Sequence, residues 1–286
     1  MCPAHGPVIL TERMTKLYGD ITAVDNLNLE VVEGEVFGFL GPNGAGKTTT
    51  CRILTTLTKP SSGRAFVSGF DVVTEPVKAK RGIGVVTQYQ NLDGELTAYE
   101  NLKLHGMLYG MEGKERKGRI AKLLQYVELE DRSSSRVSTF SGGMKRRLMI
   151  ARALLHQPKV LFLDEPTVGL DAQTRRNIWA LIRKINQEGA TVFLTTHYIE
   201  EAEMLCDRVG IIDQGILIAL DDPEQLLKVA GNIVVETLSD DGPRAKFFQN
   251  RDEASEFAAS SNEDVIVRKS NLEDVFIQLT GRRVAD

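Results

Sequence analysis

The chain has 286 residues, 42% hydrophobic and 26% charged, with a formal net charge of −4. This length is enough for one large domain plus a small appendage, and the mixed, slightly acidic charge gives no reason to expect a nucleic-acid partner. Three separated cysteines, Cys2, Cys51 and Cys206, indicate reduced thiols in a cytoplasmic protein, and four scattered histidines make a structural metal improbable.

No apolar run in the sequence approaches the roughly 18 residues of a membrane-spanning helix. The N-terminus also lacks the basic-then-apolar pattern of a signal peptide. Any role at a membrane is therefore expected to come through another polypeptide.

Residues 8 to 40 are expected to form strands. Leu27–Val31 alternates apolar and polar residues, as a half-exposed antiparallel strand does, and Val36–Leu40 is the continuous apolar run of a buried strand. Directly after Leu40 the sequence fits G-x-x-x-x-G-K-[ST] with Gly41, Pro42, Asn43, Gly44, Ala45, Gly46, Lys47 and Thr48. A helix from Thr48 to Leu57 is expected next, because Ile53, Leu54 and Leu57 have helical spacing.

Strand, glycine loop and helix in this order predict a P-loop. Glycines allow backbone N–H groups to approach phosphate oxygens, and the helix directs its positive end at the same charge. Lys47 is expected to reach the β- and γ-phosphates, Thr48 to ligate Mg²⁺, and Thr49 to belong to the nucleotide site. The sequence therefore predicts binding of a nucleoside triphosphate.

Further strands are expected at five short segments, Ala65–Ser68, Ile83–Val86, Val160–Leu163, Thr191–Thr195 and Val209–Asp213. The last four are apolar, which is typical of a parallel sheet covered on both faces. The intervening residues 94 to 157 are expected to be mostly helical, with a capping box at Thr97-x-x-Glu100. Another helix is expected to begin after Asp171 and to end near Gly189.

Two carboxylates follow the expected strand Val160–Leu163. Asp164 could hold Mg²⁺, directly or through water, and Glu165 could act as the general base that polarises the attacking water. An isolated acidic pair after a strand is as readily a solvated turn. Because a P-loop precedes this pair in the same chain, the functional interpretation is preferred.

Ser141, Gly142 and Gly143 precede a helix expected at Lys145–Leu155, so they form a second helix N-terminus suited to an anion. One P-loop already accommodates one triphosphate. A second phosphate-binding helix end therefore suggests a nucleotide held from two sides in a head-to-tail dimer. A plain Ser-Gly-Gly helix cap is the alternative.

With Phe140–Met144 included, the sequence resembles the ATP-binding cassette (ABC) ATPases over about residues 8 to 228. The family signature is Leu-Ser-Gly-Gly-Gln, from which this chain departs at Phe140 and Met144, and Met144 cannot donate the hydrogen bond of a glutamine. The resemblance implies an α/β P-loop NTPase with a RecA-like core, an antiparallel β subdomain and a helical subdomain at about residues 94–157.

The resemblance also implies roles for residues that carry little signal alone. Tyr18 is expected to stack on adenine, and Gln88 to contact Mg²⁺ or water, with Gln90 as a nearby rival. Asp171 matches the D-loop at the dimer seam, and His197 matches the switch histidine at the γ-phosphate. The expected catalytic residues are Glu165, His197, Gln88 and Lys47, and the expected Mg²⁺ ligands are Thr48, Gln88 and Asp164.

The composition changes after about Val229, which predicts a nucleotide-binding domain at residues 1–228 and a small α+β appendage at 229–286. The appendage is expected to contain strands at 232–238, 245–249 and 264–268, with a short helix before the third strand. A final helix is expected to be capped by Ser270-x-x-Glu273 and stopped by Gly281.

Asp164–Asp171, Thr195–Glu203 and the ending Asn271–Gly281 are similar to drug-resistance exporters of the daunorubicin type. That similarity implies an ATPase subunit that binds ATP and Mg²⁺ and forms a homodimer or heterodimer. It also implies attachment to permease subunits on separate chains, at the inner face of the cell membrane, for export of drugs, lipids or other hydrophobic or polymeric substrates. A groove near residues 89 to 110 is the expected docking site.

Two other functions also fit a P-loop. A soluble ABC ATPase could act on nucleic acid or ribosomes, but the chain has one P-loop, no long heptad run and no basic arm. A small-molecule kinase would leave Ser141–Gly143 and His197 without a role. The exporter ATPase is therefore the preferred hypothesis.

Overall fold

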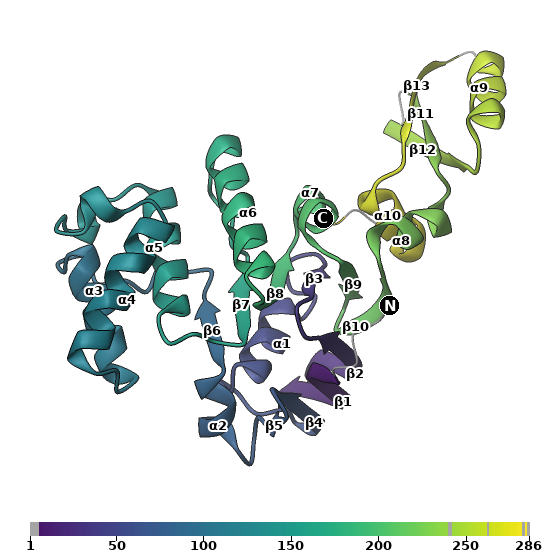
Figure 1. Cartoon of the computed structure of the whole chain (residues 1–286). Helices are drawn as coiled ribbons and strands as arrows, with labels where there is room; N and C mark the ends of the chain where they lie inside the picture. Colours follow the sequence, from purple (N-terminus) through teal and green to yellow (C-terminus); the bar gives the residue numbers. More distant parts are fainter. Residues whose placement is uncertain (1–5, 240–241, 262, 282–283, 285–286) are drawn as a thin grey trace.

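The computed structural model describes residues 6–239, 242–261, 263–281 and 284 (Figure 1). Cys2 and His5 lie outside the described residues. Cys51 and Cys206 are free and buried. The described elements form a central sheet, an antiparallel sheet beside it, a helical subdomain and a small C-terminal sheet with its own helices.

The central sheet has six strands in the order β10-β9-β3-β8-β7-β6. Its strands are β3 (Val36–Leu40), β6 (Ile83–Val86), β7 (Val160–Asp164), β8 (Thr191–Thr196), β9 (Arg208–Asp213) and β10 (Ile216–Asp221). All neighbours are parallel except β9 and β10. The predicted buried parallel sheet is confirmed, and β3, β7 and β8 are buried along their whole length. β10 was not predicted, and its side chains are only partly buried at this sheet edge.

The antiparallel sheet has the order β2-β1-β4-β5, with strands β1 (Pro7–Tyr18), β2 (Ile21–Val32), β4 (Ser62–Val67) and β5 (Phe70–Asp71). In β2 the side chains of Leu27, Leu29 and Val31 are buried, whereas Asn28 and Glu30 are exposed. This confirms the half-exposed strand that the alternation predicted.

Helices cover the central sheet, and a subdomain of helices projects from one side of it (Figure 1). Against the core lie α1 (Lys47–Leu54), α2 (Pro76–Arg81), α6 (Ala172–Gln187) and α7 (Ile199–Leu205). The helical subdomain contains α3 (Ala98–Leu108), α4 (Gly113–Tyr126), α5 (Gly142–Leu154) and the 3₁₀ turns Glu130–Arg132 and Val137–Thr139. Thr97 and Glu100 form the predicted capping box at the start of α3.

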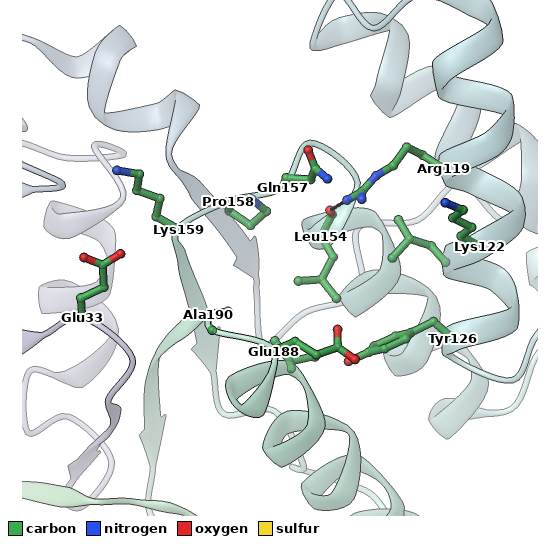
Figure 2. A pocket seen from close by; sticks show the side chains of 13 residues that line it. Glu33, Arg119, Lys122, Tyr126, Leu154, Gln157, Pro158, Lys159, Glu188 and Ala190 are labelled. Carbon is green, nitrogen blue, oxygen red and sulfur yellow. Dashed lines mark hydrogen bonds between the residues drawn. The ribbon is translucent and has the colours of Figure 1, made fainter.

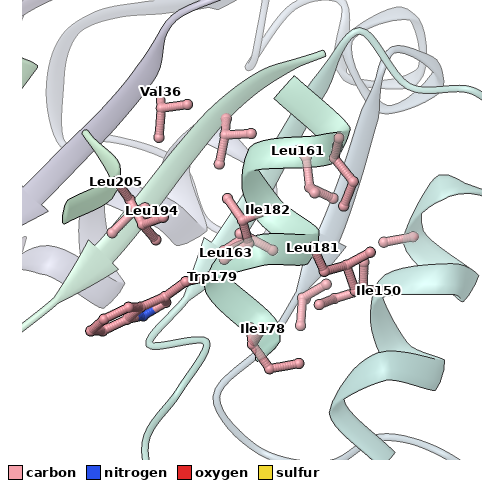
Figure 3. Close-up of a cluster of buried hydrophobic side chains, with 14 of the residues drawn as sticks. Val36, Ile150, Leu161, Leu163, Ile178, Trp179, Leu181, Ile182, Leu194 and Leu205 are labelled. Atoms are coloured by element: carbon pink, nitrogen blue, oxygen red, sulfur yellow. The ribbon is translucent and has the colours of Figure 1, made fainter. Parts of the chain in front are cut away.

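A buried hydrophobic cluster fixes α6 on the sheet (Figure 3). It includes Val36, Leu161, Leu163 and Leu194 from the strands, Ile178, Leu181 and Ile182 from α6, and Ile150 from α5. Trp179 of α6 belongs to the same cluster and is 8% exposed. Close packing of these side chains fixes α6 and α5 against the strands of the central sheet.

Two helix predictions need correction. The first helix ends at Leu54 and not at Leu57, since the chain turns at Thr55 and leaves Leu57 outside the helix and 59% exposed. The signature helix begins at Gly142 and not at Lys145, so its glycines form the first turn itself.

The C-terminal part starts with α8 (Pro223–Ala230), so the expected boundary after residue 228 falls within this helix. Then come a sheet of order β12-β11-β13, with β11 (Ile233–Ser239), β12 (Gly242–Phe248) and β13 (Asp264–Lys269), and the helices α9 (Arg251–Ser260) and α10 (Leu272–Thr280). The final helix is capped by Asn271 with Asp274, one residue later than predicted for Ser270 and Glu273. Gly281 stops it in the left-handed conformation, as predicted.

Candidate nucleotide-binding site

The predicted phosphate-site residues follow parallel strands that end at one edge of the central sheet. The P-loop follows β3, Gln88 follows β6, Glu165 follows β7 and His197 follows β8. Ligands of open α/β sheets bind at the carboxyl ends of their strands. The topology therefore brings together segments that are far apart in the sequence.

The P-loop backbone leaves no room for side chains at two of its glycines. A Cβ on Gly46 would lie 2.4 Å from the carbonyl oxygen of Ala23, and φ of this residue is +109°. A Cβ on Gly41 would lie 2.2 Å from the carbonyl oxygen of Ile212. Both glycines are thus required for the loop to pass so close to its neighbours.

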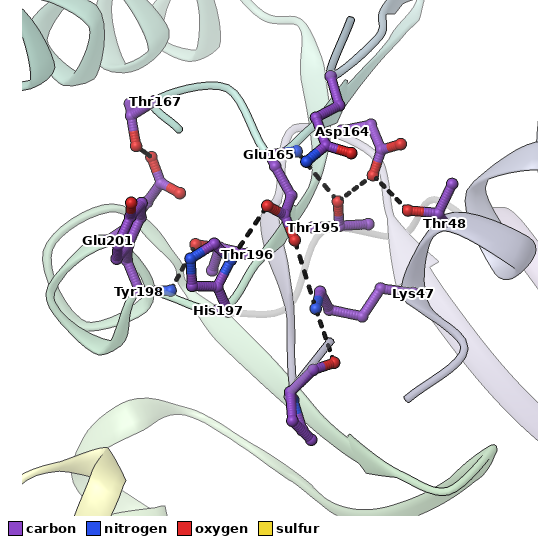
Figure 4. Close-up of polar contacts among 12 residues, drawn as sticks. Lys47, Thr48, Asp164, Glu165, Thr167, Thr195, Thr196, His197, Tyr198 and Glu201 are labelled. Atoms are coloured by element: carbon purple, nitrogen blue, oxygen red, sulfur yellow. Dashed lines mark hydrogen bonds and ion pairs between the residues drawn. The ribbon is translucent and has the colours of Figure 1, made fainter. Parts of the chain in front are cut away.

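Lys47 is buried and lies inside the loop that precedes it (Figure 4). Its ammonium donates hydrogen bonds of 2.7 Å to the carbonyl of Gly41 and 3.0 Å to that of Pro42, and lies 3.4 Å from Glu165 Oε1. Burial lowers the pKa of Lys47, against the opposing effect of Glu165. The positive charge is therefore held at the floor of the glycine loop.

Asp164 ends β7 beside two hydroxyl groups (Figure 4). Its Oδ1 accepts hydrogen bonds of 3.3 Å from Thr48 and 2.5 Å from Thr195. Burial raises the pKa of Asp164, and the two hydroxyl donors oppose that rise. The predicted pair of Thr48 and Asp164 is thus in contact and forms a set of hard oxygen donors of the kind that Mg²⁺ prefers.

The Glu165 side chain is directed toward the ammonium of Lys47, and its backbone is strained. Its φ is +48°, a left-handed value that is uncommon for a residue other than glycine. Its amide donates to the carbonyl of Thr195, 3.0 Å away, and to that residue's hydroxyl, 3.1 Å away. Its other carboxylate oxygen, Oε2, lies 3.0 Å from Nδ1 of His197.

The charges around Glu165 keep its carboxyl group ionised. Burial alone would raise its pKa, but the contact with His197 and the charge of Lys47 outweigh burial and hold the pKa below its usual value. A carboxylate that is ionised at neutral pH and only 4% exposed can accept a proton from a bound water.

A cavity of about 250 Å³ lies beside these groups and is lined by Ala23, Asn43, Gly44, Gly46, Lys47, Thr48, Thr49, Gln88 and Glu165. Asp164 and His197 are not part of its lining and contact Thr48 and Glu165, which are. Gln88 lines the cavity, whereas its rival Gln90 is exposed and does not. Ala23 of β2 was not predicted as a residue of this cavity. It lines the cavity because its carbonyl lies close to Gly46 in the folded chain.

A larger cavity, of about 450 Å³, lies away from the P-loop (Figure 2). Its lining mixes charges, with Arg119, Lys122 and Lys159 facing Glu33 and Glu188. Arg119 there already donates to the carbonyls of Leu154 and Leu155. None of the P-loop residues lines this cavity, so we do not assign the phosphate site to it.

The family model described as ABC transporter matches residues 24–168, half of the chain. The chain belongs to the ABC transporter family. The cassette is 41% identical to the Nod factor export ATP-binding protein I of Cupriavidus metallidurans, over 98% of this chain and 99% of that protein. It is 38% identical to the linearmycin resistance ATP-binding protein LnrL of Bacillus subtilis, over 98% and 100%.

Solved structures of ABC cassettes have the same fold. CbiO1 of Clostridium perfringens, part of the ABC transporter complex cbiONQ, is 28% identical with a TM-score of 0.72, covering 77% of this chain and 90% of its own. A dimeric ATP-binding cassette in a post-hydrolysis state, bound to ADP and Pi, is 33% identical with a TM-score of 0.68, covering 75% and 98%. The chain is therefore an ABC ATPase that binds and hydrolyses ATP. Within its described residues, no helix combines the length and apolarity that a bilayer crossing requires.

Other predicted site residues of the cassette lie outside the cavity. Ser141 caps α5 by accepting from the amide of Met144, 3.3 Å away, and is exposed together with Gly142. Asp171 caps α6, with both carboxylate oxygens hydrogen-bonded to Thr174, and these bonds lower its pKa. Tyr18 is 45% exposed, with the Lys16 ammonium 4.9 Å from its ring centre.

The signature helix of the cassette is tied to the Gln88 segment by a residue that sequence reasoning missed. Arg146 of α5, only 6% exposed, donates to the carbonyls of Thr87 at 2.8 Å and Gln88 at 3.3 Å. An arginine in a helix gives no periodic signal, so only the fold reveals this link.

Arg146→Ala is expected to slow ATP turnover about tenfold, because the carbonyls of Thr87 and Gln88 each lose their donor and a small misplacement in an active site is costly. Nucleotide affinity should change little, since Lys47 and Thr48 lie on other elements. Steady-state phosphate release and equilibrium binding of a fluorescent ATP analogue measure the two effects. The control is the adjacent Arg147→Ala, whose side chain instead pairs with Glu128. Equal losses in both variants would contradict the prediction.

Proposed function

We propose that this chain is the ATPase subunit of an exporter, working as a dimer on permease subunits encoded separately. The observation that carries the proposal is the meeting of Lys47 and Glu165 in one small cavity at the P-loop, with His197 in contact with the Glu165 carboxylate. The relatives named for Nod factor export and linearmycin resistance support export as the direction of transport.

The P-loop amides and Lys47 bind the phosphates of ATP and orient the γ-phosphate. Thr48 and Asp164, already in contact, would hold Mg²⁺ together with Gln88, which lines the same cavity. When bound, this ion would neutralise phosphate charge and polarise the phosphoryl group.

Glu165 accepts the proton of the attacking water, and its depressed pKa keeps it available as a base at neutral pH. His197, with Nδ1 3.0 Å from Oε2 of Glu165, orients that carboxylate. Its imidazole would contact the γ-phosphate, as the switch histidine of the family does. The strained backbone at Glu165 aims the side chain into the cavity.

Ser141 and the N-terminus of α5 complete the nucleotide site of a second copy. They can do so because Ser141 and Gly142 are exposed in the single chain. ATP held between two copies draws them together, and this closure drives the permease. After hydrolysis the two products carry more negative charge at the seam, so the copies separate and the cycle resets.

A groove between the helical subdomain and the core supports the predicted permease dock. It is lined in part by Leu57, Asn91, His105, Tyr109 and Arg152, which include residues of the predicted 89–110 segment. Burial, with the nearby charges of Arg152 and His156, lowers the pKa of His105 to about 4, so this side chain is neutral at pH 7. The lining contains no carboxylate. We expect it to accept an apolar segment that carries an acidic side chain.

Affinity purification of the tagged chain from membranes solubilised in a mild detergent tests the proposal. A polytopic membrane protein is expected to co-purify, and Leu57→Lys, at a position 59% exposed in the groove, should release it. The control is Ile216→Lys, 50% exposed on the edge strand β10. Co-purification of ribosomes or nucleic acid in place of a membrane protein would overturn the proposal.

A further inference from the structure

The short helix α7 begins two residues after His197 and carries three glutamates, Glu200, Glu201 and Glu203, of which the last two are the less exposed. Residues two positions apart lie about 200° around a helix, so these side chains leave α7 on opposite sides. Each makes contacts with a different part of the molecule, and neither belongs to the nucleotide cavity.

Glu201 binds α7 to the core. It is fully buried, and its Oε1 accepts hydrogen bonds of 2.9 Å from Thr167 and 3.0 Å from Nε1 of Trp179 (Figure 4 shows the first). Thr167 lies in the turn between Glu165 and Asp171, and Trp179 lies on α6. This side of α7 is thus fixed to the loop that follows the reactive carboxylate.

Glu203 binds α7 to the C-terminal part of the chain. Its Oε1 accepts a 2.7 Å hydrogen bond from the backbone amide of Leu272, the first residue of α10. First-turn amides of a helix have no partner within the helix, so Glu203 satisfies one that α10 cannot satisfy itself. Leu272, Val275 and Phe276 are fully buried in the hydrophobic cluster that also contains Ala202 and Leu205 of α7.

The start of α10 is itself held rigidly. The side chains of Asn271 and Asp274 form a reciprocal capping box, and Arg268 of β13 donates to Asp274 at 2.6 and 2.8 Å and to Glu236 of β11 at 2.9 Å. In Figure 1, α10 and α8 lie between α7 and the small sheet. A continuous series of contacts therefore runs from the C-terminal sheet to the helix that follows His197.

From these contacts we propose that Glu203 is a positioning residue for ATP hydrolysis, through which the C-terminal part holds α7, and with it His197, in place beside Glu165. The proposal rests on the role proposed above for His197. It gives the C-terminal part a function in turnover: any ligand or partner that displaces α10 changes the rate of hydrolysis without touching the nucleotide.

The test compares Glu203→Ala, Glu203→Gln and His197→Ala in the full-length chain, with kcat and KM for ATP measured from phosphate release. Glu203→Ala is expected to lower kcat roughly tenfold, the scale of a small displacement in an active site, and to leave KM within about twofold. Glu203→Gln keeps an oxygen acceptor for the Leu272 amide and should restore kcat. Glu200→Ala, on the same helix with its side chain 67% exposed, is the matched control and should behave as the unchanged protein.

A double variant separates positioning from a general loss of stability. If Glu203 acts through His197, adding Glu203→Ala to His197→Ala should lower kcat no further, because residues that act as a unit are not additive. Additive losses would overturn the proposal, as would an unchanged kcat in Glu203→Ala or a failure of Glu203→Gln to restore it. If His197→Ala is impaired and Glu203→Ala is not, only this inference fails. If His197→Ala turns over normally, the proposed role of His197 fails and this inference with it.

Should Glu203→Ala not fold, Arg268→Ala provides the same test from the far side of the contact. It removes the donors to Asp274 and Glu236 and so loosens the start of α10, without altering α7. A fall in kcat with KM unchanged is the expected result. Normal kcat in a folded Arg268→Ala protein would overturn the proposal.

Discussion

Glu165→Gln is expected to slow ATP hydrolysis by about 10²–10⁴-fold, the usual contribution of a positioned general base. The amide has nearly the shape of the carboxylate but cannot accept the proton of the attacking water. ATP binding should persist or strengthen, because the substitution removes a buried negative charge beside the γ-phosphate. The substitution should therefore leave ATP in place and trap the closed dimer.

Single-turnover phosphate release measures the slowed step, and size-exclusion chromatography with and without ATP measures the dimer. The control is Glu35→Gln, which removes another buried carboxylate, 5% exposed and paired with Arg208 just before β3. A Glu165→Gln protein that stays monomeric with ATP and hydrolyses it at the normal rate would refute the base assignment.

Ser141→Arg is expected to abolish hydrolysis while a single chain still binds nucleotide. Ser141 is exposed and lies outside the P-loop cavity, so a bulky cation there disturbs only what approaches from another molecule. Lys47→Ala should also be inactive, but through loss of the phosphate contact in its own P-loop. The control for the serine change is Ser138→Arg, an exposed serine one turn before the helix.

Mixing these two inactive proteins gives the most direct test of a shared site. In a mixed dimer, the intact P-loop of the Ser141→Arg chain faces the intact Ser141 of the Lys47→Ala chain, so one complete site forms. Random pairing in a two-fold dimer should restore about a quarter of normal activity if one site suffices. A mixture that stays inactive while each variant still dimerises would argue against a site built from two chains.

Much of this fold could be predicted from the sequence because its local signals agree with one another. The continuous apolar run predicted a buried strand at Val36–Leu40, and the alternation of apolar and polar residues predicted a half-exposed strand at Leu27–Val31. Both strands are confirmed, and the glycines after Leu40 form the predicted loop. The shift of the final helix cap from Ser270 to Asn271 shows where local reasoning ends. Both residues suit a cap, and the contact of Asp274 with Arg268 favours the second.

The contacts within the site were harder to predict. The sequence places Thr195 in a strand, but only the parallel register of β7 and β8 sets it opposite Asp164. Arg146 and Glu203 are charged residues on helices. Each binds a backbone group far away in the sequence, the carbonyl of Thr87 and the amide of Leu272 respectively. Every residue has a backbone amide and carbonyl, so the sequence does not indicate which one a side chain will bind. These contacts can be identified only from the folded structure.

The left-handed backbone at Glu165 has a consequence for how this protein evolves. A non-glycine residue in that conformation costs about 1–2 kcal/mol, and glycine would remove the cost. Glycine would also leave the buried ammonium of Lys47 without its anionic partner, a loss larger than the strain it relieves, so selection for thermal resistance has no route through this position.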